Sequence, residues 1–162
     1  MSFDIRENII RPALQLSYLW DENSEMLVFL TGIAESGYTN LKQVSGPALS
    51  YWQIEPDTHT FLKEYLEKPE RVNLKSRILS ACEMIILPSH HQLVYNMRYA
   101  AIMCRVRYLN AKPCIPFWND AVGMAEYHAK WYNRGGKADV EKNTILFQKI
   151  IDRDRIESWK TP

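Results

Sequence analysis

Apolar side chains recur at helical spacing along almost the whole chain, and no run of four or more residues shows the alternation that a half-buried strand requires. The clearest stripe is formed by six apolar residues of one segment: Leu93, Met97, Ala100, Ala101, Cys104 and Tyr108. Their spacing of i, i+4, i+7, i+8, i+11 and i+15 predicts one long amphipathic helix. The chain is therefore predicted to be mainly α-helical.

Six other segments carry the same pattern, which brings the prediction to about seven helices. They cover, approximately, residues 11–19, 26–37, 57–68, 78–86, 117–133 and 138–152. Pro12 suits the first turn of its helix, where a missing N–H is tolerated. Pro88 is expected to stop the helix over 78–86, whose apolar face is predicted to include Ile85 and Ile86.

The longest irregular stretch runs from Thr39 to Ile54, contains Gly46-Pro47 and has room for a small hairpin. We find no internal repeat, linker or change of composition that would divide the chain, so residues 1–162 are predicted to form a single domain. A chain of this length can bury roughly two-thirds of its unfolded surface around one core.

The charge and the cysteines exclude several classes of protein. The 20 basic and 19 acidic side chains give a net charge of +1, which excludes the strong basic excess of a general nucleic-acid binder. Cys82, Cys104 and Cys114 lack CxxC spacing, so neither a disulfide framework nor a zinc site is predicted, and folding in a reducing cytosol is expected. Neither a signal peptide nor a membrane span is expected, because no stretch has the required apolar length.

The four histidines form no helical i, i+4 pair, and no acidic residues are arranged around them. They are His59, His90, His91 and His128. We therefore predict surface or loop histidines rather than metal ligands, and expect neither a metal nor another cofactor.

A resemblance to a known family begins at the end of the helix predicted over 26–37. Before the loop stands the run Glu35-Ser36-Gly37-Tyr38. Later in the loop and into the next predicted helix stands a second run, Ser45-Gly46-Pro47-Ala48-Leu49-Ser50-Tyr51-Trp52-Gln53-Ile54-Glu55-Pro56-Asp57-Thr58. This order resembles the lytic transglycosylase and goose-type lysozyme superfamily, where Glu-Ser precedes a variable loop and then Gly-Ala-x-Gly-Leu-Met-Gln-Ile-x-Pro-x-Thr. Further on, Trp131-Tyr132-Asn133-Arg134-Gly135-Gly136 is similar to the family's Ala-Tyr-Asn-x-Gly motif.

The resemblance extends over most of the chain. The opening Ile10-Arg11-Pro12-Ala13-Leu14, the loop running into Trp52-Gln53, and the late Tyr-Asn segment are similar to a bacteriophage-encoded branch of this group. The resemblance implies a lysozyme-like helical domain that cleaves peptidoglycan between N-acetylmuramic acid and N-acetylglucosamine.

Cleavage of a glycosidic bond needs a carboxylic acid that is still protonated near neutral pH, which requires an apolar environment. Glu35 is the predicted catalytic residue, and neighbouring apolar and aromatic side chains are expected to desolvate it. By family resemblance, the substrate-binding or orienting residues are Ser36, Tyr38, Trp52, Gln53, Tyr132 and Asn133. Ser36 matches the motif serine that supports the glutamate, and the Tyr132 hydroxyl is expected to orient the carboxyl group.

The sequence leaves the reaction product open. A hydrolase needs a second carboxylate, for which Glu55 and Asp57 are the nearest candidates, although both fall where a turn and a helix cap at Asp57 or Thr58 are expected. A transglycosylase of this type uses one glutamate as acid and then as base, and forms a 1,6-anhydro end. Ser50 replaces the family's second loop glycine, which usually permits an unusual dihedral angle, so an inactive relative that keeps the fold also stays open.

The function predicted from the resemblance is a phage-type muramidase. It would act on peptidoglycan glycan strands from a phage virion, as part of entry, or from the host cytoplasm before release to the cell wall, as an endolysin. The alternative is a virion structural component, internal or in the neck or tail, that uses the same fold with weak or no catalytic activity and contacts other virion proteins.

Overall fold

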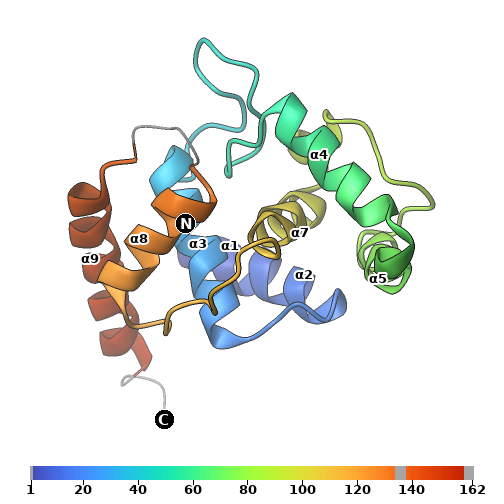
Figure 1. Cartoon of the computed structure of the whole chain (residues 1–162). Helices are drawn as coiled ribbons and strands as arrows, with labels where there is room; N and C mark the ends of the chain where they lie inside the picture. Colours follow the sequence, from blue (N-terminus) through green and yellow to red (C-terminus); the bar gives the residue numbers. More distant parts are fainter. Residues whose placement is uncertain (1, 134–137, 159–162) are drawn as a thin grey trace. The chain divides into compact units, whose positions relative to one another are not determined.

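Helices account for most of the chain in the computed structural model, which describes residues 2–133 and 138–158 (Figure 1). The fold is 65% helical, and the 2% counted as strand consists, among the described residues, of isolated bridges that form no sheet. The predicted mainly α fold is therefore confirmed. The chain divides into two compact units, residues 1–110 and 111–162. The prediction of a single domain stays a prediction.

The first unit is built around one central helix. Its elements are α1 (Ser2–Ile5), the π-helix η1 (Arg6–Ile10), α2 (Arg11–Leu16), α3 (Glu22–Ser36), α4 (Pro56–Glu67), the 3-10 helix η2 (Pro69–Arg71), α5 (Val72–Ala81), α6 (Gln92–Tyr95) and α7 (Met97–Tyr108). α7 contacts α2, α3, α4 and α5, and its residues are buried continuously from Tyr99 to Cys104. A helix that is buried all round forms the core of its unit.

α3 carries the motif glutamate on its last turn, and the sequence places both of its ends. At the start, the Asp21 carboxylate accepts from the Ser24 N–H at 2.9 Å and the Ser24 hydroxyl accepts from the Asp21 N–H at 2.9 Å, a reciprocal capping box. Residues 26–30 are fully buried. At the end, Gly37 adopts a φ of 58°, the left-handed conformation in which glycine commonly terminates a helix.

Two predicted helices are interrupted, and both predictions are wrong in the same way. The stripe from Leu93 to Tyr108 is broken at Asn96, which has φ −121° and accepts the Tyr99 N–H through its side chain at 2.9 Å, so that it caps α7. The helix predicted over 78–86 ends at Ala81 because Glu83 has a φ of 57°.

Ile85 and Ile86 therefore lie outside a helix and outside the core. They are 93% and 74% exposed, whereas the sequence pattern predicts them on an inward face. The Met84 N–H donates to the Leu79 carbonyl at 2.9 Å, which closes the end of α5 before the two isoleucines.

The prolines place two other helix boundaries differently from the prediction. The chain is already helical from Ser2, so Pro12 does not begin the first helix. In a regular α-helix the proline ring would collide with the carbonyl group four residues earlier, and the wider π-helix η1 just before Pro12 makes room for the ring. α4 begins at Pro56, which occupies the first helical position, so Glu55 is the N-cap residue rather than Asp57 or Thr58.

The second unit contains α8 (Ala121–Trp131) and α9 (Val140–Ser158), which lie side by side (Figure 1). α8 begins later than residue 117 because the Asp120 carboxylate caps it by accepting the Gly123 N–H at 2.9 Å. His128 is buried, with its ring stacked on Tyr132 at a centroid distance of 5.7 Å.

A buried carboxylate joins the first helices of the first unit. Glu25 is 1% exposed. Its oxygens accept from Arg6 Nε at 2.7 Å, from Arg11 Nε at 2.8 Å and from Trp20 Nε1 at 2.6 Å. Burial raises the pKa of Glu25, but the hydrogen bonds from Arg11, Trp20 and Arg6 outweigh it, and the pKa lies below its ordinary value. Glu25 therefore ties η1 and α2 to the first turn of α3.

A second buried polar cluster joins α4 to α7. His59 is buried, and its Nε2 lies 2.8 Å from the Tyr99 hydroxyl. The His90 ring lies 5.5 Å from the His59 ring, and His90 Nε2 lies 2.8 Å from the Ile54 carbonyl oxygen. The prediction that the histidines are surface or loop residues is thus wrong for His59 and for His128, since both are buried inside helices.

The His59 cluster makes the stability depend on pH. Burial, followed by the positive charges of His90 and Lys63, lowers the pKa of His59 to about 4. The unfolded chain takes up this proton near pH 6.5 and the folded chain only near pH 4, so the contribution is complete above pH 6.5 and is lost as the pH falls towards 4. Between pH 7 and pH 5 we expect the free energy of unfolding to fall by about 2 kcal/mol.

Urea unfolding at the two pH values measures this loss. In the His59→Asn variant the loss should shrink by most of that amount, while the exposed His91→Asn substitution should leave it unchanged. An equal loss in the parent and in His59→Asn would show that His59 is not responsible.

Candidate functional site

The candidate site lies where α3 ends and the segment 37–55 begins. Glu35 is on the last turn of α3 and is partly exposed. Gly37 and Tyr38 both adopt left-handed conformations, with φ of 58° and 56°, and these turn the chain sharply away from the helix. Figure 1 shows the residues that follow as a long excursion between α3 and α4.

Ser36 ties the end of α3 to this excursion. Its hydroxyl donates to the Tyr51 carbonyl at 2.7 Å and accepts from the Tyr38 N–H at 3.1 Å. The serine beside Glu35 thus holds the helix end against a residue fifteen positions later in the chain. This contact fixes the backbone that carries Glu35.

Replacing Ser36 with alanine should lower the free energy of unfolding by about 1–2 kcal/mol, because one hydrogen bond is lost and the buried Tyr38 N–H loses its acceptor. Urea denaturation followed by circular dichroism measures the change. Ser45→Ala, at an exposed position in the same loop, is the matched control and should change stability by less than about 0.5 kcal/mol. Equal effects of the two substitutions would contradict a tether at Ser36.

Tyr38 and Trp52 anchor the loop on α3. The Trp52 side chain is fully buried and its Nε1 donates to the Val28 carbonyl at 2.8 Å. The Tyr38 hydroxyl donates to the Phe29 carbonyl at 2.9 Å, and its ring packs against Gly32, where a Cβ atom would collide with it. Both side chains are therefore part of the core of the first unit.

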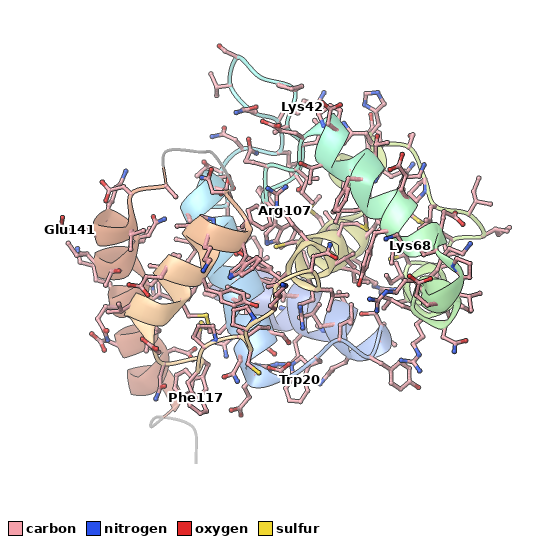
Figure 2. All side chains as sticks on the ribbon, viewed as in Figure 1. Trp20, Lys42, Lys68, Arg107, Phe117 and Glu141 are labelled. Atoms are coloured by element: carbon pink, nitrogen blue, oxygen red, sulfur yellow. The ribbon has the colours of Figure 1, made fainter. Side chains whose placement is uncertain are left out.

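The middle of the loop is hairpin-like without forming a strand among the described residues. Two isolated bridges join Lys42 to Leu49 and Leu49 to Ile54, and Figure 2 shows Lys42 on this excursion. Ser50 is buried with a φ of 68°, the left-handed region that favours glycine. Ser50 thus carries a side chain in a backbone conformation that glycine adopts more readily.

Gln53 is the loop residue best placed to meet a ligand. It is partly exposed, and its amide nitrogen donates to the Ser50 carbonyl at 2.7 Å and to the Asn40 carbonyl at 3.1 Å. Among the described residues no hydrogen bond reaches its amide oxygen. Glu55 and Asp57, the candidates for a second carboxylate, are exposed at the start of α4.

Tyr132 and Asn133 belong to the second unit. Tyr132 is the C-cap residue of α8 and is buried, and the Asn133 N–H donates to the His128 carbonyl at 3.1 Å. Residues 134–136, the rest of this motif, lie outside the described residues. Glu35 and Ser36 therefore lie on the last turn of α3, and Gln53 lies on the loop that Ser36 contacts at Tyr51, whereas Tyr132 and Asn133 lie at the end of α8.

Three further findings bear on function. Within the described ranges, no three His, Cys, Asp or Glu side chains gather as a metal site. No helix among these residues is both long enough and apolar enough to cross a membrane. Comparison of the chain with protein-family models, curated proteins and solved structures finds no match. The resemblance to lytic transglycosylases thus rests on the sequence motifs.

Proposed function

We propose that the chain cleaves the glycan strands of peptidoglycan as a lytic-transglycosylase-like muramidase, with Glu35 as general acid and then general base. The observation that supports this best is the 2.7 Å hydrogen bond from Ser36 to the Tyr51 carbonyl. It fixes the helix end that carries Glu35 against the loop that carries Gln53. A general acid is effective only where its position relative to the substrate is held.

In the proposed reaction, the Glu35 carboxyl group protonates the oxygen that links N-acetylmuramic acid to the next sugar, and the C1–O bond breaks. The carboxylate then removes the proton from the 6-hydroxyl, whose oxygen bonds to C1, and a 1,6-anhydro end forms. The Gln53 amide oxygen accepts a hydrogen bond from a sugar hydroxyl. Hydrolysis instead would require a carboxylate that activates water, for which Glu55 and Asp57 are the candidates.

The purified protein should be incubated with bacterial peptidoglycan and the released muropeptides analysed by mass spectrometry. Release of 1,6-anhydro ends would support the transglycosylase, and release of reducing ends would support a hydrolase with a second carboxylate. No release by a protein shown by circular dichroism to be folded and helical would contradict the proposed activity.

The exposed pair Ile85 and Ile86 favours the alternative function, a virion structural component. A segment that presents apolar side chains to solvent is typical of a surface that contacts another protein. Quantifying the protein in purified phage particles and in late lysate distinguishes a particle-borne role, in structure or entry, from a role in lysis. A protein present in particles serves assembly or entry, and one present in lysate alone serves lysis.

A further inference from the structure

Thr31 and Tyr108 form a buried polar pair between α3 and α7. Both side chains are buried, and their hydroxyl oxygens lie 2.8 Å apart. The Thr31 hydroxyl donates to the Leu27 carbonyl at 2.7 Å, so its own hydrogen is used within α3. The Tyr108 hydroxyl is therefore the donor to Thr31.

This pair lies one helical turn before Glu35. Thr31 and Glu35 are four residues apart on α3 and so share a face, and side chains on a helix lean towards its N-terminus. The Glu35 side chain consequently extends back towards the Thr31 and Tyr108 hydroxyls. The pKa of Tyr108 is raised well above its ordinary value by burial, and further by Cys104 and by Glu35. The contribution of Glu35 agrees with a position of its carboxyl group near the Tyr108 hydroxyl.

The end of α7 that carries Tyr108 is itself fixed. The preceding residue, Arg107, which Figure 2 labels, donates from Nη1 to Thr58 Oγ1 on α4 at 3.0 Å. Around the pair the buried face of α3 is apolar, from Met26 to Leu30. A pair of apolar side chains of the same shape would serve packing about equally well, so packing alone gives no reason for the two hydroxyls.

We propose that the Thr31–Tyr108 pair positions the Glu35 carboxyl group. The hydrogen bond between the two hydroxyls joins α3 to α7 one helical turn before Glu35. The hydroxyl dipoles thus lie on the side towards which the Glu35 carboxyl group extends. The contribution of the pair to catalysis rests on the proposed function, whereas its effect on the Glu35 carboxyl group does not.

The Thr31→Val/Tyr108→Phe double variant tests the proposal, because it removes both hydroxyls and keeps the shape and burial of the pair. We expect it to fold with a urea midpoint close to the parent's. The control is Tyr99→Phe, which removes a hydroxyl that bonds His59 elsewhere on α7. In protein labelled with carbon-13 at the glutamate side-chain carboxyls, Glu35→Gln identifies the Glu35 resonance by its disappearance.

The Glu35 resonance should shift in the double variant and stay in place in Tyr99→Phe. An unshifted resonance in the double variant would overturn the positioning role. Muropeptide release should show a kcat lowered about tenfold with KM unchanged, within the hundredfold loss that a displacement of about 1 Å causes. An unchanged kcat in an active, folded double variant would overturn it as well.

If the parent itself releases no muropeptides, the proposed function fails and the carbon-13 spectrum alone decides the positioning role. The two failures are therefore distinguishable.

Discussion

Replacing Glu25 with glutamine is expected to lower the free energy of unfolding by about 3–5 kcal/mol, because it removes a buried charge that two partly buried guanidinium groups share. Arg6 and Arg11 both donate to the Glu25 carboxylate, and the side chain of Glu25 is only 2% exposed. An amide of the same shape offers one oxygen in place of two and turns N–H groups towards the arginines. The loss should exceed that of any surface charge of the chain.

Glu22→Gln is the matched control, since Glu22 is exposed on the same first turn of α3. It should change the free energy of unfolding by less than about 1 kcal/mol. Urea denaturation at pH 7 measures both variants. A Glu25→Gln variant as stable as Glu22→Gln would show that the arginines find other acceptors and that the carboxylate does not organise the helix junction.

The lowered pKa of Glu25 adds a pH dependence of known sign. The unfolded carboxyl group takes up its proton near its ordinary pKa, and the folded one only at lower pH. The stability from this group is therefore present above the ordinary pKa and is lost as the pH falls through the folded value. His59 loses its contribution at higher pH, between 6.5 and about 4, so the two groups destabilise the fold in succession on acidification.

The helix pattern of the chain could be predicted where burial repeats at the helical period and the ends carry local signals. α3 is the clearest case, because its apolar run is followed by Gly37, whose conformation ends the helix. The breaks at Asn96 and Glu83 could not be predicted in the same way. Periodicity continues across them, and only the backbone dihedral angles at these two residues interrupt the helices.

The burial of polar residues in the core could not be predicted from the sequence pattern, for a different reason. Glu25 lies on a first turn, where an acidic residue is expected on the surface next to the helix dipole. Its burial depends on Arg6, Arg11 and Trp20, whose contacts arise only when η1 and α2 fold against α3. Such a network is a tertiary property with no local signal.

In the candidate site, too, local features could be predicted from the sequence and tertiary contacts could not. The motif predicts Glu35 at a helix end and Ser36 beside it, and both lie there. The roles of Tyr38 and Trp52 depend on which way the loop folds, and it folds so that both rings are buried. Thr31 carries one usable signal in the sequence, its spacing of four residues from Glu35. Tyr108 was hidden in an apolar stripe, because periodicity does not show where a hydroxyl points.

Glu35→Gln should reduce muropeptide release by about 10³-fold, the middle of the range for removal of a general acid and base. Glutamine keeps the shape of the side chain but can neither give up nor take up a proton at the glycosidic oxygen. Initial rates of release, measured by mass spectrometry against peptidoglycan, give the comparison. Glu22→Gln, at the opposite end of the same helix, should retain the parent's rate.

Stability separates this effect from a folding defect. A carboxylate near the C-terminal end of a helix is unfavourable by about 0.3–1 kcal/mol, since the helix dipole is negative there. We therefore expect Glu35→Gln to unfold within about 1 kcal/mol of the parent, in contrast to Glu25→Gln at the other end of α3. A stable but inactive Glu35→Gln beside an active Glu22→Gln would assign the chemistry to Glu35. Equal activity of the parent and Glu35→Gln would instead remove Glu35 from the reaction and assign the chemistry to another residue.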